Sequence, residues 1–133
     1  MSISLIRKGL GANLGTIRGL RVAETIPDNP SPPIAVIALG NVTYDGAFDG
    51  GLTVYNFTVS VIVGRVAERE AQRRLDAFIS TGEGGIKYAI ESEKSLDGAA
   101  YDVRVSEMTN VGAVQLGDAT YLACDFAVQV YAR

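Results

Sequence analysis

The side chains that most often carry out acid–base chemistry or bind transition metals are scarce in this sequence. Histidine is absent, so the usual general base near neutral pH and the commonest nitrogen ligand for metals are both missing. The single cysteine, Cys124, falls within an alternating apolar segment, where a cysteine behaves as a small core hydrophobe rather than as a nucleophile. We therefore predict neither a catalytic triad nor a zinc centre.

Carboxylates remain as candidate acid–base groups. Asp45, Asp49 and Asp118 are formal candidates, but no spacing singles out one pair, and solvated turn positions explain all three. Residues 45–50 contain two carboxylates and glycines, yet they lack the alternating ligands and terminal Glu of a calcium loop. The glycine-rich segment at residues 9–15 has the wrong spacing for a dinucleotide loop. We expect no catalytic residue, no metal and no cofactor, and we predict that the protein is not an enzyme.

One loop has the features of a contact surface. Residues 41–51 are rich in Gly and Asp, are too long for a minimal hairpin turn, and carry the aromatic residues Tyr44 and Phe48. Phe48 lies between glycines and acids, where little local core is available to it. Two interpretations stay open: the loop docks on a partner, or Phe48 folds back onto its own sheet. The candidate partner-contact residues are Tyr44, Asp45, Phe48 and Asp49.

The elements flanking this loop have a clear hydrophobic pattern. Between residues 52 and 63 apolar and polar side chains alternate, which predicts a strand with one buried face. After Gly64 the period changes, and a helix over residues 67–79 places the following apolar residues on one stripe: Ala71, Leu75, Phe78 and Ile79. The sequence therefore predicts a sheet with one face covered by helices.

The N-terminal third adds a helix and two strands. Apolar residues recur at intervals of three and four over residues 3–15, which predicts a helix that burial must hold in place because Gly9 and Gly11 weaken its intrinsic propensity. Residues 20–25 are consistent with a short strand. The continuous apolar run at residues 34–39 suits a central strand that is covered on both faces.

The C-terminal part predicts antiparallel sheet. Residues 86–91 form a short helical segment after a glycine-rich break, and alternation returns at residues 101–106 and 122–130. The dipeptide Gly117-Asp118 marks a turn before the last strand. Together these patterns predict an α/β (α+β) fold with a mixed, largely antiparallel sheet and helices packed on one face.

Composition places the chain among globular proteins. The length, residues 1–133, fits a single domain. Hydrophobic residues make up 47% of the chain and charged residues 20%, a composition that argues against wholesale disorder. The formal charge is −3 and no long basic run occurs, so we expect no sequence-specific nucleic-acid binding. A signal-peptide pattern and a membrane-spanning apolar run are both missing, which favours synthesis in the cytosol and no membrane contact.

Several short motifs follow one another in a characteristic order over nearly the whole chain. After the N-terminal helix they are, in order, the proline-rich residues 26–33, Ile34-Ala35-Val36-Ile37-Ala38-Leu39, Tyr44-Asp45, Phe48-Asp49-Gly50-Gly51-Leu52, Gly64-Arg65-Val66 and Gln72-Arg73-Arg74-Leu75-Asp76. This pattern resembles the tail terminator proteins of long-tailed (siphovirus-type) bacteriophages, particularly those that infect actinobacteria. The neighbouring head–tail connector (stopper or head-completion) proteins and other minor tail proteins are the alternatives.

The resemblance implies a structural virion protein located in the neck region of the tail and assembled in the host cytoplasm. Six copies would form a homo-oligomeric, hexameric ring on the last ring of the tail tube protein, end tube polymerisation, and offer a surface to the head–tail connector or stopper protein. DNA would pass through the channel without sequence-specific binding. The resemblance carries no catalytic residues, because such a ring acts through its geometry.

The net charge of the chain suggests how a ring of six copies would treat passing DNA. Six copies have a formal charge of 6 × −3 = −18, and acidic residues facing the channel would repel passing DNA; ordinary solubility is the alternative explanation. Two other functional classes stay open from the residues alone. They are an adaptor that binds peptides through a strand edge and a hydrolase that uses only carboxylates.

Overall fold

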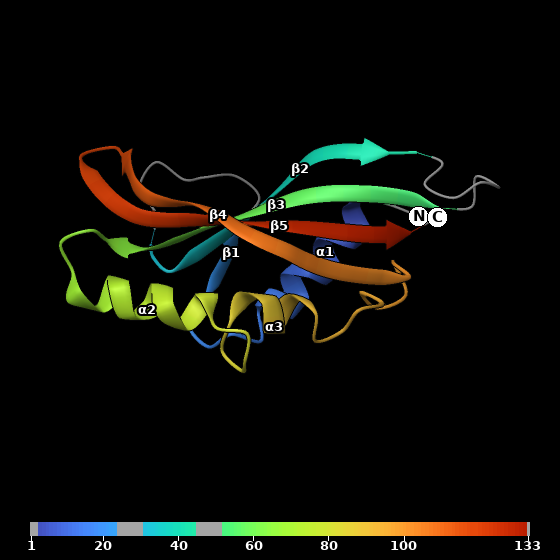
Figure 1. Ribbon diagram of the computed structural model, residues 1–133, viewed down its shortest axis with the longest axis horizontal. Coiled ribbons are helices and arrows are strands. Elements are labelled where there is room, and N and C mark those ends of the chain that lie inside the picture. Colours follow the sequence, from blue (N-terminus) through green and yellow to red (C-terminus); the bar gives the residue numbers. More distant parts are fainter. Residues whose placement is uncertain (1–2, 24–30, 45–51, 133) are drawn as a thin grey trace.

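The computed structural model describes residues 3–23, 31–44 and 52–132, which form a single five-stranded sheet and three helices (Figure 1). In chain order the elements are α1 (Ile3–Leu14), β1 (Arg21–Ala23), β2 (Ile34–Thr43), β3 (Thr53–Arg65), α2 (Arg69–Ile79), α3 (Ile86–Ile90), β4 (Asp102–Leu116) and β5 (Ala119–Ala132). The strand order is β1-β2-β3-β5-β4. Only β1 and β2 pair in parallel and the other pairs are antiparallel, so the predicted mixed, largely antiparallel α+β fold is confirmed.

All three helices lie on one face of the sheet (Figure 1). The period-two pattern of β3 and β5 explains this arrangement, because every second side chain of both strands is apolar and faces the helices. The register places Phe57 opposite Val128 and Val61 opposite Cys124, and all four side chains are buried. The alternation predicted for these two strands is therefore confirmed.

The main core is built from the apolar stripes of the helices and the helix-facing side of the sheet. Its helical members, all of them buried, are Ile6, Leu10 and Leu14 from α1, Leu75 and Phe78 from α2, and Ile86 and Ile90 from α3. The spacing of three and four residues within each helix gives it one apolar stripe. Burial of these stripes stabilises helices that are too short or too glycine-rich to persist alone.

The segment that follows α3 packs tightly against α1. Asn13 is buried, and its side-chain amide donates hydrogen bonds to the main-chain oxygens of Ile90 (2.8 Å) and Glu93 (3.0 Å). Leu96 is buried against Gly9 and has a φ of 49°, a left-handed conformation that is uncommon for a leucine. A Cβ atom on Gly9 would lie 2.7 Å from Leu96 Cβ, so this close approach requires glycine.

The opposite face of the sheet carries no helix among the described residues. At one end Ile34, Ile62 and Tyr121 form a second, smaller buried cluster. Elsewhere the residues on this face are mostly small or polar, and they are partly or fully exposed. The two faces of the sheet therefore differ sharply in polarity.

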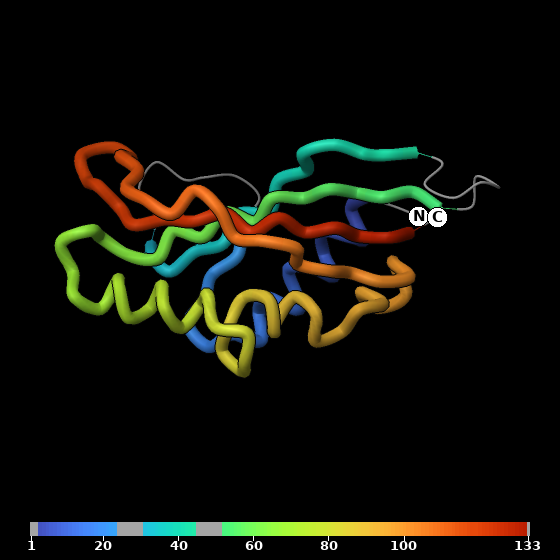
Figure 2. The backbone as a smooth tube through the Cα atoms, viewed as in Figure 1, coloured from blue at the N-terminus to red at the C-terminus, as the bar shows by residue number. Residues whose placement is uncertain are grey.

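The β4–β5 hairpin bends away from the helices at its distal end, as the backbone trace shows (Figure 2). The pairing register shifts between Thr109 and Gly112, and Asn110 has a φ of 55°. The Asp125 carboxylate accepts hydrogen bonds from Asn110 (2.9 Å) and Ser60 (2.7 Å), which fixes the irregular segment. Such a bulge increases local twist, and this accounts for the bend.

Three sequence predictions need correction. The strand predicted at residues 34–39 continues to Thr43, so residues 41–43 of the predicted loop belong to β2. This strand is buried on both faces only from Ile34 to Ile37, where Ala35 and Ile37 join the main core and Ile34 joins the smaller cluster on the other face. Helix α2 begins at Arg69, two residues later than predicted, and Ile79 is 39% exposed because it lies at the end of the helix.

Candidate functional site

The predicted contact loop is described only at its beginning. Tyr44 directly follows β2 and is 74% exposed, which makes it the most exposed of the large apolar side chains in the described part of the chain. The other three candidate residues, Asp45, Phe48 and Asp49, lie outside the described residues. The two interpretations of Phe48 therefore both stay open, whereas the exposure of Tyr44 suits a contact role.

The remaining candidates for chemistry are separated in space or buried. Cys124 is 1% exposed in β5, and burial, with a smaller contribution from the neighbouring Asp125, raises the pKa of its thiol to about 12. The thiol is therefore a core group, as predicted. Asp118 occupies the turn between β4 and β5. Within residues 3–23, 31–44 and 52–132 no group of three or more Cys, Asp or Glu side chains is placed to hold a metal ion.

No helix in the described ranges combines the length and the apolar character required to cross a lipid bilayer.

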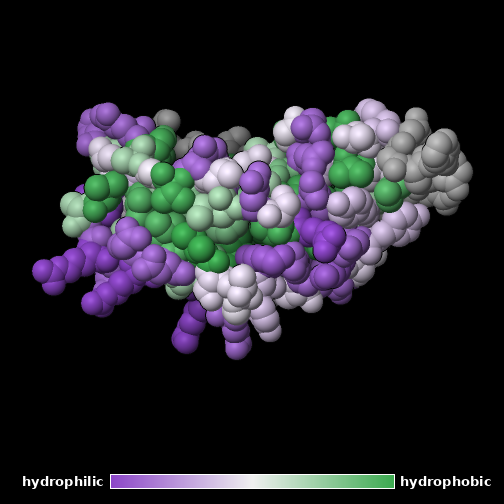
Figure 3. All heavy atoms as spheres, in the orientation of Figure 1, coloured by the Kyte–Doolittle hydropathy of each residue, from purple (hydrophilic) through white to green (hydrophobic). Residues whose placement is uncertain are grey.

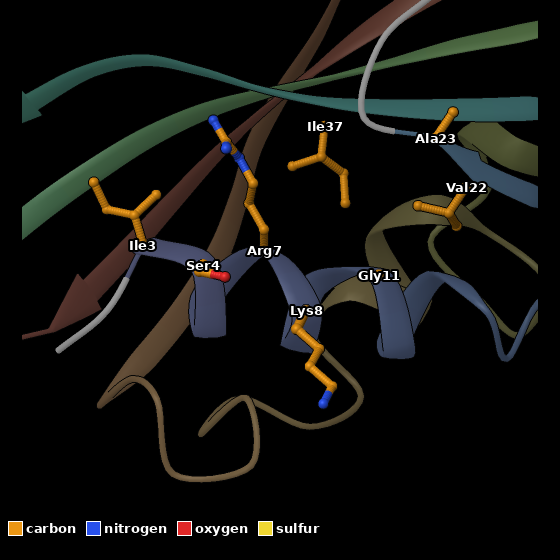
Figure 4. Close-up of a pocket in the computed structure, with 8 residues that line it drawn as sticks. All are labelled: Ile3, Ser4, Arg7, Lys8, Gly11, Val22, Ala23 and Ile37. Carbon is orange, nitrogen blue, oxygen red and sulfur yellow. The ribbon is translucent and has the colours of Figure 1, made fainter.

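A cleft of about 540 Å³ lies beside α1 (Figure 4). We call it the α1 cleft; residues that line it include Ile3, Ser4, Arg7, Val22, Ala23 and Ile37. One wall is the N-terminal half of α1, and the other is formed by the end of β1 and by β2. Strand β1 ends at Ala23, opposite Val36, and Ile37 is the first residue of β2 without a partner on that side. The cleft therefore lies where β1 stops covering the edge of β2.

Arg7 is the main polar group of the α1 cleft. It projects from α1 toward β2 (Figure 4), and its Nε atom is shielded from solvent with no hydrogen-bond partner among the described residues. A buried N–H donor without an acceptor destabilises the folded protein. Guanidinium groups normally donate hydrogen bonds to oxygen acceptors. The next residue, Lys8, also borders the cleft. The cleft is therefore suited to an oxygen acceptor that the described chain does not supply.

On each of the other two helices, a cationic side chain donates a hydrogen bond to a main-chain oxygen of a strand. On α2, Arg74 donates to the main-chain oxygen of Val63 at the end of β3 (2.9 Å). On α3, Lys87 donates to the main-chain oxygen of Val105 in β4 (3.2 Å). Each of these helices thus satisfies a strand carbonyl with a long cationic side chain. Arg7 of α1 is oriented in the same way but has no strand carbonyl beside it.

Side chains of the described residues cap the outer edge of β4 near its start, at Val105 and, through Asp102, at the N–H of Val103 (2.9 Å). The Val105 N–H donates to Glu91 (2.8 Å) and its carbonyl accepts from Lys87, and these two side chains also pair with each other. Burial by itself raises the pKa of Glu91, but the hydrogen bonds from Lys87 and Val105 and the charges of Lys87 and Lys94 outweigh it and hold the pKa below its usual value. No strand of the described chain pairs with β4 on its outer side.

Apolar side chains are exposed next to the uncapped part of β4. Seen from the side of β4, the surface has an apolar patch between the β4–β5 hairpin and α2 (Figure 3). Exposed apolar residues of these elements are Val66, Ile79, Val111 and Val114. A shallow groove of about 270 Å³ runs beside them, lined in part by Val105 and Met108. Contiguous exposed apolar surface of this kind is typical of protein–protein contacts.

Sequence signals existed for some of these features. Lys87 and Glu91 have the i, i+4 spacing of a helical ion pair, although their contact with a strand cannot be read from that spacing. Arg7 occupies the apolar stripe of α1, four residues after Ile3 and three before Leu10, where a cation is unexpected. The prediction of a contact loop concentrated on residues 41–51 and missed both of these features.

Comparison with known proteins gave no relatives: no protein-family model matches the chain, and no curated protein matches it. Its architecture and surfaces must therefore carry the functional argument.

Proposed function

We propose that this protein is a tail terminator of a long-tailed bacteriophage. In this proposal six copies form a ring at the head-proximal end of the tail tube, where the ring ends tube polymerisation and joins the tail to the head–tail connector. The function is structural, and it depends on subunit shape and on contacts between copies. DNA passes through the ring without sequence-specific binding.

The observation that carries the proposal is the distribution of unpaired sheet edge. Among the described residues, β2 beyond Val36 has no strand on the side of β1, and β4 beyond Val105 has no strand on the side away from β5. A subunit with two different unpaired edges at opposite ends supports head-to-tail contacts, which close into a ring when the rotation per subunit allows it. The order of sequence motifs, which resembles that of tail terminators, points to the same assembly.

The polarity of the sheet supports an inward-facing role for its helix-free face. Between Thr53 and Ile62 of β3, and in the paired residues of β2 and β5, Asp125 is the only charged residue directed to this face. Arg7, Arg73 and Arg74 lie on the helices, whereas Arg65 and Arg104 lie at the margins of the helix-free face, where they pair with Tyr121 and Gln129. The central part of this face would offer a channel neutral polar groups and the Asp125 carboxylate, which bind the phosphate backbone weakly. We therefore place the helix-free face toward the channel.

A head–tail connector or stopper protein is the second candidate. It would use the same ring geometry but would bind the head side of the neck. The exposed Tyr44 at the end of β2 suits either assignment, since both rings contact a neighbouring ring.

A null mutation in the gene, made in the phage that encodes this chain, separates the candidates. Loss of a terminator should give DNA-filled heads together with unattached tails whose lengths are no longer uniform. Loss of a connector should give detached tails of normal length. Normal infectious particles in the null mutant would exclude both functions.

A further inference from the structure

We propose that the α1 cleft is the receptor for the β4 edge of a second copy of this chain, which adds a strand to β2 beyond Val36, where no described strand pairs with β2 on the side of β1. This inference rests on the proposed ring and identifies its subunit contact. We define as the bare β2 edge residues 37–43 of β2, which pair with β3 on one side and with no described strand on the other. We define as the bare β4 edge residues 106–116 of β4, which have no described strand on the side away from β5.

The first argument is the shape of the α1 cleft. Strand β1 runs parallel to β2 and ends at Ala23, opposite Val36, whereas β2 continues to Thr43. The cleft begins at that point, with the end of β1 and Ile37 of β2 on one side and α1 below (Figure 4). Its position is that of the next strand of the sheet. An extended segment placed there would pair with the bare β2 edge and cover the exposed part of α1.

The second argument is the unsatisfied cation. Arg74 and Lys87 each reach a main-chain oxygen of a strand within the chain, whereas the Nε of Arg7 finds no acceptor in the described residues. A strand added in the cleft would bring main-chain oxygens beside Arg7. The same helix-to-strand contact would then occur at all three helices, and the buried donor would be satisfied.

The third argument identifies the occupant as the bare β4 edge of another copy. Three antiparallel pairings separate β2 from β4, so the two strands run in opposite directions. A neighbouring copy in the same orientation would therefore present β4 antiparallel to β2. Val114 of β4 pairs with Tyr121 and therefore lies on the helix-free face, so in the added strand it would lie on the same face as Ala38 and Thr43 of β2.

The composition of the two edges agrees with pairing. Natural edge strands are usually protected by lysine, proline or inward-pointing charges. Residues 37–43 contain no charged residue and no proline, and residues 106–116 contain Glu107 as their only charged residue. The part of β4 that is protected, at Val105, lies just before the bare segment. Among the described residues the β4 edge is thus protected by side chains at Val103 and Val105 and by the bulge between Thr109 and Gly112, and the residues on either side of that bulge are left to pair with a further strand.

Disulfide cross-linking of the full-length chain tests the contact. Cysteines are introduced singly at exposed positions of the same sheet face, with Ala38→Cys or Thr43→Cys in β2 and Thr109→Cys or Val114→Cys in β4. One variant of each mixed pair carries a tag so that mixed dimers can be told from identical ones. The native thiol of Cys124 is buried and should not interfere.

The proposal predicts cross-links between a β2 variant and a β4 variant, and far fewer between two copies of the same variant. Adding Arg7→Met should lower the cross-linking yield by about tenfold, as expected for loss of a charge-assisted hydrogen bond. The matched control Arg21→Met, at an exposed position of β1 outside the cleft, should leave the yield unchanged. Thermal unfolding should be the same for both variants, which separates a contact role of Arg7 from a folding role.

Cross-links only between identical variants, or no cross-links, would overturn the inference. If the chain nevertheless forms a ring in the virion, the proposed function stands and another surface makes the contact. If mixed cross-links form but no ring occurs in the virion, the head-to-tail contact stands and the proposed function fails.

Discussion

Two glycines of α1 should respond in opposite ways to the same substitution. Replacing glycine by alanine within a helix stabilises it by roughly 1 kcal/mol, because alanine restricts the unfolded chain and has the higher helix propensity. At Gly11 the added Cβ would meet only Val22 Cγ1 at 3.7 Å, which is ordinary contact. At Gly9 it would lie 2.7 Å from Leu96 Cβ and 3.1 Å from the Leu96 carbonyl oxygen. Overpacking of this kind costs about 1–3 kcal/mol.

Gly11→Ala should therefore raise the free energy of unfolding by about 0.5–1 kcal/mol, and Gly9→Ala should lower it by about 1–2 kcal/mol. Urea denaturation followed by circular dichroism, with both variants and the wild type measured at one pH, gives the comparison. Equal stabilisation by the two substitutions would refute the close packing of α1 against Leu96. It would also show that the helix responds only to its local propensity.

Three further predictions concern the core, the β4 cap and the contact residue. Phe126→Ala should lower the free energy of unfolding by about 3–5 kcal/mol, since Phe126 is a buried core side chain, and a thermal scan with wild-type stability would contradict its placement. Glu91→Gln should destabilise the protein by roughly 1–2 kcal/mol at pH 7 through the weakened β4 cap. Because the folded-state pKa of Glu91 is lowered, its contribution is present above its ordinary value of 4.5 and is lost as the pH falls through the folded pKa, so the stabilities of variant and wild type should converge in acid denaturation curves. Tyr44→Ala should leave thermal unfolding nearly unchanged, because the side chain is 74% exposed, but should weaken attachment of tails to heads in a reconstitution assay; unchanged attachment would remove Tyr44 from the contact surface.

The strands and helices with a clear hydrophobic periodicity could be predicted from the sequence. The alternation in β3 and β5 identified their buried faces, and the stripes of α1 and α2 identified the helices that cover them. Both patterns arise from burial of one face, which is a local property of the sequence. The predicted fold class followed from combining them.

The features that depend on distant pairing could not be predicted. Residues 41–43 resemble a turn, yet they continue β2 because Val42 pairs with Tyr55 of β3. The cap on Val105 joins side chains of α3 to a strand more than ten residues later in the chain. The cleft beside Arg7 depends on where β1 ends relative to β2, which no local pattern records. Long-range pairing, rather than residue type, therefore creates the candidate contact surfaces.

The most direct test of the account is a subunit-resolved electron cryomicroscopy reconstruction of the neck of the phage particle that contains this chain. The account predicts a closed ring of six copies on the head-proximal end of the tail tube, with a combined mass of 6 × 14.1 = 84.6 kDa and with the helix-free face of each sheet toward the channel. A particle that holds this chain as a single copy, or a neck in which it is absent, would contradict the account.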